Sequence, residues 1–475
     1  MSDRGAPGAR TTFDLAVIGA GSAGFSAAIT AAEAGARVAL IGSGTIGGTC
    51  VNVGCVPSKA LIRAVEPIHQ ARAAARFDGI EAEARVTGWR AAVAQKQALV
   101  DELRAAKYVG LLPSYDRISY LPGAARFEAN GRLVVGGDAV AAGRIVVATG
   151  SRPALPGIPG IETVPVLDST SALDLETVPP SLLVIGAGYV GAELAQVFAR
   201  AGARVTLVSR RGLLPEAEPE ISHALTGYLG DEGIASVSGI AYERIERTAA
   251  GAALRVRAGG ETRALEASAV LVATGRRPNT EALGLRHAGI ETDARGSILV
   301  DDAMRTTRAG VYAAGDVTGR DQFVYMAAYG ARIAATNALN GDSLRYDATG
   351  MPAVVFTDPN LATVGYTEAA AKAAGIATKT SVLALEHVPR ALAARDTRGL
   401  IKLVADAGTR KLIGAHILAP EGADSIQTAA LAIRAGMTHD ELGATIFPYL
   451  TTVEGLKLAA QTFDRDVGKL SCCAG

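Results

Sequence analysis

The chain has 475 residues, of which 49% are hydrophobic and 55 are glycine, and its 47 basic side chains balance 47 acidic ones. A formal net charge of zero removes the electrostatic case for binding nucleic acid or an anionic membrane. The length predicts roughly two to four domains, and without an apolar run of about 18 residues we expect no transmembrane helix. Only four cysteines occur, in two close pairs, which favours a cytoplasmic protein that uses thiols for redox chemistry or soft-metal binding.

A dinucleotide site is predicted near the N-terminus, after a lead-in of residues 1–12 that we expect to be disordered. A buried strand at 13–18 runs into a GxGxxG turn, an Ala-rich helix to about residue 34 and a second strand at 37–41. In this context the glycines let the backbone approach a pyrophosphate, which then sits at the N-terminus of the helix. The residues of the turn are Gly19, Gly21, Ser22, Ala23 and Gly24.

One position departs from the dinucleotide pattern. The acid that usually holds a ribose hydroxyl at the end of the second strand is replaced by Gly42. Ser43, the backbone or water are the substitutes that the sequence offers for it.

A cysteine pair follows shortly after. Cys50 and Cys55 are five residues apart at the start of a predicted helix, where a helix N-terminus lowers the pKa of a thiol. Such a spacing puts two Cα atoms about 8.6 Å apart in an ideal helix, whereas a disulfide tolerates no more than about 7 Å. Joining the thiols therefore requires a distorted first turn, which Gly54 and Pro57 permit. A disulfide on a strained turn beside a cofactor is reducible, so we predict a redox centre.

A second unit repeats the first. A strand at 181–185, a second GxGxxG turn and a helix at 192–200 lead into residues 201–207, which nearly copy 34–40. Two embedded βαβ units predict two dinucleotide sites. Arg210 and Arg211 follow this unit's second strand, where they suit the 2′-phosphate of NADP; the alternative is a solvated basic turn. The second turn consists of Gly186, Gly188, Tyr189, Val190 and Gly191.

Three further features complete the two units. Glu193 lies early in the second helix among apolar neighbours and needs a cation, for which Lys59 is the natural candidate. Asp316 follows a strand within 306–316, where open α/β sheets hold ligands, so it is a candidate for a ribityl or ribose hydroxyl. Tyr108 lies near the end of an amphipathic helix predicted at 96–112, and alone it indicates only packing.

The C-terminal part has a different sequence pattern. Strands at 400–404 and 411–417 flank a turn as a β-hairpin, and a helix is predicted at 422–435. This region carries no phosphate loop, so we expect an α+β domain that forms a subunit interface. After it, residues 463–475 are predicted to be a flexible tail ending in Cys472 and Cys473. Adjacent cysteines suit a dithiol that captures a soft cation, although an incidental pair is the alternative.

Together these motifs resemble the flavin-dependent pyridine nucleotide–disulfide oxidoreductases, and the stretch GGTCVNVGCVPSK at 47–59 is highly specific to that family. The resemblance implies an α/β fold with two Rossmann-like FAD/NAD(P)-binding domains plus a C-terminal α+β dimerisation domain. The implied boundaries are 13–155 with 276–348 for FAD, 156–275 for NADPH, 349–462 for dimerisation and 463–475 for the tail.

The resemblance also implies the roles of the site residues. Cys50 faces the substrate, Cys55 contacts the flavin, and Lys59 pairs with Glu193 near the reactive edge of the flavin. NADPH occupies the second turn together with Arg210, Arg211 and Gly275. FAD occupies the first turn and contacts Gly48, Thr49, Lys59, Thr149, Gly150, Gly315 and Asp316.

Within the family the chain is similar to the mercury-reducing branch. Family members that reduce organic disulfides carry a His-Pro with a downstream glutamate as a proton donor, and here the matching residues are Phe447 and Pro448. The resemblance implies that Tyr108 and Tyr449 line the metal site. It further implies reduction of Hg(II), supplied as thiolate complexes, in a homodimer whose tail serves the partner's site. The implied metal ligands are Cys50, Cys55, Cys472 and Cys473.

Two alternatives remain open from the sequence. A reductase for a small organic disulfide shares every feature up to Phe447. A non-catalytic thiol protein that sequesters metal explains Cys472 and Cys473 but leaves two dinucleotide folds unused.

Overall fold

The computed structural model describes residues 12–469, and the chain divides into two compact units. Unit 1 consists of Met1–Ala60, Ala94–Ala154 and Gly275–Asp347. Unit 2 consists of Leu61–Val93, Leu155–Thr274 and Ala348–Gly475. Helices α3 (Cys55–Arg72) and α4 (Trp89–Lys107) each contribute residues to both units. Among the described residues, no helix combines the length and the apolar character that crossing a bilayer requires.

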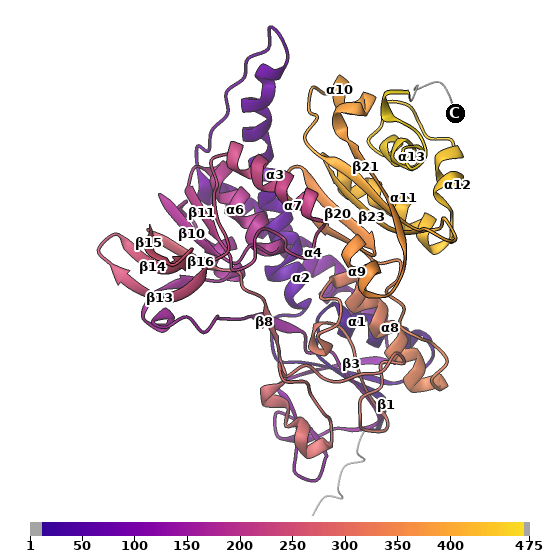
Figure 1. Ribbon diagram of the computed structural model, residues 1–475. Helices are drawn as coiled ribbons and strands as arrows, with labels where there is room; N and C mark the ends of the chain where they lie inside the picture. The colour runs from indigo at the N-terminus through magenta and orange to yellow at the C-terminus, as the bar shows by residue number, and fades with distance from the viewer. Residues whose placement is uncertain (1–11, 470–475) are drawn as a thin grey trace, which may run out of the picture. The chain divides into compact units, whose positions relative to one another are not determined.

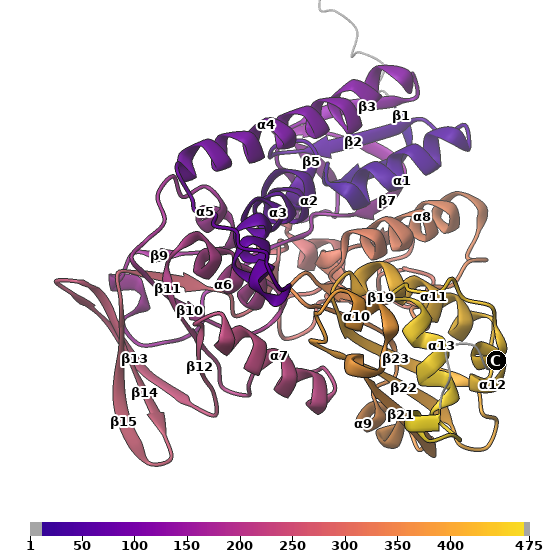
Figure 2. The same cartoon turned by 90° about the horizontal axis from the view of Figure 1, so that it is seen from above.

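A parallel five-stranded sheet with the order β18-β7-β1-β2-β3 forms the centre of unit 1. All five residues of β2 are buried, because α1 packs against the strand and Ile41 shares an apolar cluster with Phe127 and Leu133 of the antiparallel strands β4 and β5. Helices α1 and α8 pack against each other and lie side by side over the sheet (Figures 1 and 2). The elements are β1 (Thr12–Ile18), α1 (Ser22–Glu33), β2 (Val38–Gly42), β3 (Ile118–Pro122), β7 (Ala141–Val147), β18 (Val311–Ala313) and α8 (Val324–Asn340).

Smaller elements complete unit 1. Besides the parallel sheet, this unit contains a three-stranded antiparallel sheet, β4-β5-β6, and a two-stranded antiparallel sheet, β17-β8. The bounds are α2 (Gly48–Val53), η2 (Val109–Ser114), β4 (Ala125–Phe127), β5 (Leu133–Val135), β6 (Asp138–Ala139), β8 (Ser151–Pro153), β17 (Arg276–Pro278), η4 (Glu281–Leu283), η5 (Leu285–Ala288) and η6 (Asp316–Thr318).

Unit 2 contains a second parallel sheet, in the order β12-β11-β10-β16-β9. A three-stranded antiparallel sheet, β13-β14-β15, extends from it (Figure 1), and the sequence pattern did not indicate these hairpins. The bounds are η1 (Ala73–Arg76), η3 (Ile161–Thr163), β9 (Val166–Leu167), α5 (Ser169–Leu173), β10 (Ser181–Ile185), α6 (Tyr189–Ala201), β11 (Arg204–Val208), α7 (Pro219–Asp231), β12 (Ala235–Val237), β13 (Ala241–Thr248), β14 (Gly251–Ala258), β15 (Glu261–Ala267) and β16 (Ala269–Val272).

The C-terminal part of unit 2 is an antiparallel sheet in the order β19-β20-β23-β22-β21. The predicted hairpin is β22 paired with β23, and the predicted helix is α11, so both predictions are confirmed. The bounds are β19 (Pro352–Val355), β20 (Asn360–Gly365), α9 (Glu368–Ala373), β21 (Thr378–Ala384), η7 (Leu385–His387), α10 (Pro389–Ala393), β22 (Leu400–Asp406), β23 (Leu412–Ala419), α11 (Gly422–Arg434), α12 (His439–Ala444), α13 (Glu454–Gln461) and η8 (Val467–Lys469).

Two boundaries differ from the sequence predictions. The helix expected at 96–112 is α4, which begins at Trp89 and ends at Lys107. It begins earlier than predicted because Trp89 is buried and its indole donates a hydrogen bond to Leu175 O at 2.8 Å. The predicted start of the tail, Phe463, is too early in the chain. The Phe463 ring is buried and stacks on His439, with 4.2 Å between the ring centroids. The packed C-terminal domain therefore includes Phe463.

Candidate active site

The first GxGxxG turn joins β1 to α1 through backbone contacts that exclude side chains. A Cβ on Gly19 would lie 2.2 Å from Ala148 O, and one on Gly24 would lie 1.7 Å from Gly19 O. Helix α1 follows Gly21 at its N-cap, and no side chain caps it. The N–H groups at the start of this 12-residue helix therefore have no side-chain partner and can bind an anionic ligand, so the turn fits the pyrophosphate of a dinucleotide.

The cysteine-bearing segment is fastened to that turn. Gly47 N–H donates to Ala20 O at 2.8 Å, and a Cβ on Gly48 would lie 2.6 Å from Gly21 Cα. Gly47 takes a φ of 97°, which favours glycine. The start of α2 therefore lies directly against the predicted phosphate loop.

The two thiols lie on two helices that meet at Gly54. Cys50 belongs to α2, and Cys55 is the first residue of α3. A Cβ on Gly54 would lie 2.9 Å from Thr49 O, so the tight break requires glycine. The predicted distortion of the helix start is confirmed, and it brings the Cys50 and Cys55 side chains into hydrogen-bonding contact as thiols.

The pKa of Cys50 differs from the sequence expectation. A helix N-terminus was expected to lower the pKa of these thiols, but the pKa of Cys50 is raised. The hydrogen bond with the Cys55 side chain is the main cause, followed by burial and by repulsion from the Cys55 charge. The positive charge of Lys59 acts in the opposite direction and favours the Cys50 thiolate.

Tyr108 lies over the cysteine-bearing segment. It is the N-cap of η2, and its hydroxyl forms a 3.1 Å hydrogen bond with Ser22 Oγ. Its ring packs edge-on against Phe25 at 5.0 Å and would lie 3.3 Å from a Cβ on Gly47. Burial raises its pKa, and the charges of the two cysteines add to this effect. The structure thus brings this predicted tyrosine to the cysteine pair as a neutral phenol.

A hydrogen-bonded support under α2 was not apparent in the sequence. Asn52 donates to Ile46 O at 3.0 Å and to Gly48 O at 2.8 Å. Arg104 of α4 donates to Asn52 Oδ1 at 3.1 Å and pairs with Asp101 at 2.7 Å. These contacts fix the short helix that carries Cys50.

The residues predicted to hold the rest of FAD lie at the carboxyl ends of β7 and β18. Thr149 Oγ1 donates to Asn279 O at 2.9 Å, and the Asn279 amide donates back to Thr149 O at 2.9 Å, which fixes the turn at Gly150. A Cβ on Gly315 would lie 3.1 Å from Ala23 Cβ, so Asp316 begins η6 beside the first turn of α1.

Asp316 has partners that sequence reasoning missed. Ser151 Oγ donates to Asp316 Oδ2 at 2.6 Å. Arg276 Nε donates to Ser151 Oγ at 2.7 Å and lies 3.7 Å from the same carboxylate oxygen. No sequence signal points to Ser151 or Arg276, because they lie 165 and 40 positions from Asp316 in the chain.

The second GxGxxG turn repeats the contacts of the first. A Cβ on Gly186 would lie 2.4 Å from Ala273 O, and one on Gly191 would lie 1.9 Å from Gly186 O. Gly188 is the N-cap of α6, again without a capping side chain, and a Cβ on it would meet nothing within 4 Å. Tyr189 and Val190, which follow it, are partly exposed. This turn also fits a pyrophosphate.

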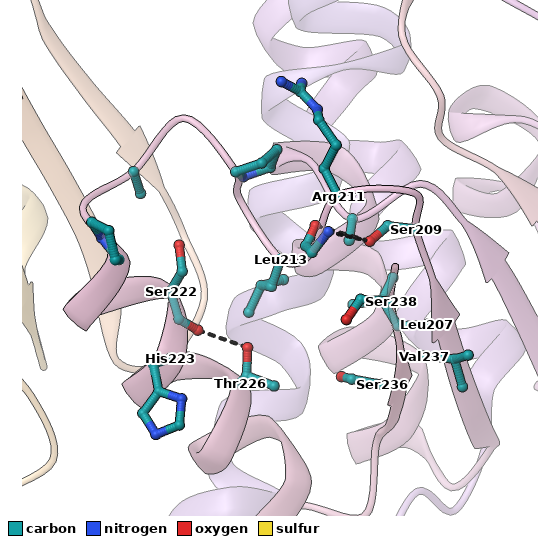
Figure 3. Close-up of a pocket in the computed structure, with 15 residues that line it drawn as sticks. Leu207, Ser209, Arg211, Leu213, Ser222, His223, Thr226, Ser236, Val237 and Ser238 are labelled. Atoms are coloured by element: carbon teal, nitrogen blue, oxygen red, sulfur yellow. Dashed lines mark hydrogen bonds between the residues drawn. The ribbon is translucent and has the colours of Figure 1, made fainter. Parts of the chain in front are cut away.

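A pocket of about 420 Å³ lies beyond the end of β11 (Figure 3). Of the two arginines predicted to bind a 2′-phosphate, Arg211 lines this pocket and Arg210 is not among its lining residues. Arg211 pairs with Glu216 at 2.8 Å, and both side chains are mostly exposed, so the bond is weak and can be exchanged for a phosphate. The polar lining that the sequence reasoning did not identify is Ser209, Ser222, His223, Thr226, Ser236 and Ser238.

Glu193 is buried in α6, as predicted, and its Oε1 accepts a hydrogen bond from Phe356 N–H at 2.9 Å. Lys59 lies near the start of α3. The pairing of Lys59 with Glu193 stays a prediction.

The segment that distinguishes the subfamilies lies before α13. Glu454 is buried and accepts from Leu450 N–H at 3.2 Å. Phe447 packs against the core of the C-terminal sheet, whereas Tyr449 is 57% exposed. Cys472 and Cys473 lie outside the described residues.

Comparisons with known proteins agree with this geometry. Residues 13–335 match the family described as pyridine nucleotide-disulphide oxidoreductase, and residues 351–460 match its dimerisation domain. This match implies FAD and NAD(P)H as cofactors.

Several relatives are similar over nearly the whole chain. A mercuric reductase of Shigella flexneri is 50% identical over 98% of this chain and 84% of its own length. A mercuric reductase of Streptomyces lividans is 47% identical over 98% of this chain and 99% of its own length. One of Bacillus cereus is 47% identical over 98% of this chain and 73% of its own length.

Solved structures share the fold. The HOCl-induced flavoprotein disulfide reductase RclA from Escherichia coli is 32% identical, with a TM-score of 0.82 over 94% of this chain and 99% of that one. LpdA from Mycobacterium tuberculosis is 26% identical, with a TM-score of 0.84 over 95% and 99%. The chain therefore belongs to the pyridine nucleotide-disulphide oxidoreductase family, as a homologue of its mercuric reductases.

Proposed function

We propose that this protein is an NADPH-dependent, FAD-containing mercury(II) reductase. The observation that carries the proposal is the Cys50–Cys55 pair, held in hydrogen-bonding contact beside the first dinucleotide turn. The 45–50% identity to mercuric reductases over nearly the whole chain supports the choice of substrate.

The overall reaction is NADPH + Hg(II) → NADP⁺ + H⁺ + Hg(0), which transfers two electrons to the metal. FAD, when bound, supplies the two-electron relay between the nicotinamide and the thiol site. Cys50 and Cys55 hold Hg(II) as thiolates, because soft sulfur ligands select soft cations. Cys50 must lose its proton to do so, and the charge of Lys59 favours that loss.

The C-terminal segment supports a metal rather than an organic disulfide as substrate. Release of an organic thiolate needs a proton donor, and Phe447 has no titratable group. Glu454, at the position of the family's downstream glutamate, accepts a backbone hydrogen bond from Leu450 instead. When Hg(II) passes between ligands by thiolate exchange, an incoming thiolate replaces the leaving one, so its capture does not need this proton relay in the same way.

A homodimer with shared sites is part of the proposal. The C-terminal domain exposes large apolar side chains, among them Ile446 at 95% and Leu431 at 59%. Exposed apolar surface of this kind marks an interaction site, and the dimerisation-domain match favours a second copy as the partner. We propose that Cys472 and Cys473 of one protomer pass Hg(II) to Cys50 and Cys55 of the other by thiolate exchange.

The test is Hg(II)-dependent oxidation of NADPH with loss of volatile mercury. Cys55→Ala should lower this activity by more than the roughly 10- to 100-fold that outer-shell changes cost at metal sites, because it removes a ligand. Retention of the flavin absorbance shows that the variant is folded. Full activity of Cys55→Ala would exclude the mechanism, and turnover of glutathione disulfide at rates that match Hg(II) would instead indicate an organic disulfide reductase.

A further inference from the structure

The end of β2 lacks the carboxylate that the dinucleotide fold uses for a ribose hydroxyl. Gly42 occupies that position and is buried. Its backbone is fixed, since Gly19 N–H donates to Ile41 O at 2.8 Å and Gly123 N–H donates to Gly42 O at 2.8 Å. The strand therefore ends in its usual place beside the first phosphate loop, but without the usual side chain.

The space for that side chain is already taken. A Cβ on Gly42 would lie 2.8 Å from Ala20 Cβ and 3.0 Å from Tyr120 Oη. Ala20 belongs to the phosphate loop and has no flexible end that could move away. An acid at residue 42 is thus excluded by packing, and the phenol oxygen of Tyr120 stands on the path that such a side chain would follow.

Tyr120 reaches this place from the neighbouring strand. It lies on β3 opposite Leu40 of β2, and it is partly exposed. Its hydroxyl donates to Gly42 O at 3.4 Å, a long hydrogen bond to an oxygen that Gly123 N–H already occupies. A hydroxyl offers one donor and two acceptor positions, so this group retains capacity for a ligand.

We propose that the Tyr120 hydroxyl replaces the strand-end carboxylate and binds the adenosine ribose of FAD. A ribose hydroxyl both donates and accepts, and a neutral phenol can do the same without carrying a charge. The bond is weaker than the charge-assisted one that it replaces. This inference deepens the proposed function, because it rests on FAD being the cofactor, and it makes Tyr120 a cofactor-positioning residue.

The experiment measures FAD release from the full-length holoprotein on serial dilution, by flavin fluorescence. Tyr120→Phe keeps the ring and removes the hydroxyl, so it should raise the Kd for FAD roughly three- to tenfold. Tyr115→Phe is the matched control, because Tyr115 lies five residues earlier and its hydroxyl also makes a single 3.4 Å bond, to Glu33. Tyr115→Phe should leave the Kd unchanged.

The rival is the exposed Ser43, which follows Gly42. An unchanged Kd for Tyr120→Phe would overturn the inference, and a raised Kd for Ser43→Ala alone would assign the ribose to Ser43. Thermal unfolding of the flavin-free variants, expected to match the parent, separates lost binding from lost folding. Because FAD release is read without mercury, this inference and the proposed reductase activity can fail independently of each other.

Discussion

Two thiols in hydrogen-bonding contact repel each other when both are charged, so one of them keeps its proton more tightly. In this protein that residue is Cys50, whose pKa is raised first by the Cys55 side chain and then by burial. Lys59 opposes the effect only in part. The reduced pair therefore presents Cys50 as a thiol at neutral pH, and metal capture must displace its proton.

The raised pKa predicts how the reactivity of Cys50 depends on pH. Cys55→Ala removes the main cause, so the pKa of Cys50 should fall and its thiolate should form at lower pH. Lys59→Met removes the favourable charge and should shift the profile to higher pH. Site-resolved alkylation by iodoacetamide, followed by mass spectrometry between about pH 6 and 10, measures both effects: a lower pKa of Cys50 appears as faster alkylation at a given pH and a higher pKa as slower alkylation. A profile that Cys55→Ala leaves in place would show that Cys55 is not what raises the pKa of this thiol.

The residues that the sequence identifies differ in kind from those that it misses. The cysteine pair and both glycine turns are recognisable because spacing along the chain determines their geometry. Ser151 and Arg276 are not recognisable, because their contacts with Asp316 arise only when distant strands meet. Tyr120 is missed for the same reason, since its relation to Gly42 depends on strand register.

At the scale of elements, the same distinction explains the boundaries. The ends of α1 and α11 follow local patterns and are predicted well. Helix α4 begins seven residues earlier than predicted, because its first residue, Trp89, is anchored by a hydrogen bond to Leu175, 86 positions away. A local pattern contains no information about such an anchor.

The break between α2 and α3 supports a prediction about geometry. Gly54→Ala would place a Cβ 2.9 Å from Thr49 O and 3.3 Å from Cys50 Cα, so it should push Cys50 away from Cys55. We expect a loss of about 1–3 kcal/mol in stability from the overpacking. We also expect slower formation of the Cys50–Cys55 disulfide with diamide, measured by thiol titration.

Gly44→Ala is the matched control for this change. Gly44 lies just before α2, whereas Gly54 follows it, and a Cβ on Gly44 would meet nothing within 4 Å. It should leave both stability and disulfide formation unchanged. If Gly54→Ala oxidised as fast as the parent, the tight break would not be what holds the thiols together.

At the scale of the molecule, unit 2 joins the second nucleotide-binding sheet to the C-terminal sheet. One apolar cluster includes Leu182 of β10, Leu361 of β20 and Leu418 of β23. A charge cluster around the buried Lys402–Glu218 pair crosses the same boundary: Lys402 of β22 contacts Glu218 at 3.0 Å and the more exposed Glu220 and Glu368 at 3.0 Å and 2.9 Å. The two sheets therefore share one core and one ionic cluster.

Lys402 supplies the positive charge of this cluster, and its side chain is 2% exposed. His416 also lies 3.7 Å from Glu218, but burial lowers the pKa of this imidazole and favours its neutral form. Burial alone would lower the pKa of Lys402, but the three carboxylates outweigh that effect and raise the pKa, so the amine stays charged. Lys402→Met should cost about 3–5 kcal/mol of unfolding free energy, because it leaves the buried Glu218 carboxylate without its counter-charge. Lys411→Met, at an exposed position, should cost less than about 0.5 kcal/mol. Urea unfolding at a fixed protein concentration measures both, since a dimer's stability depends on concentration. Equal losses for the two variants would mean that the apolar cluster alone holds the sheets together.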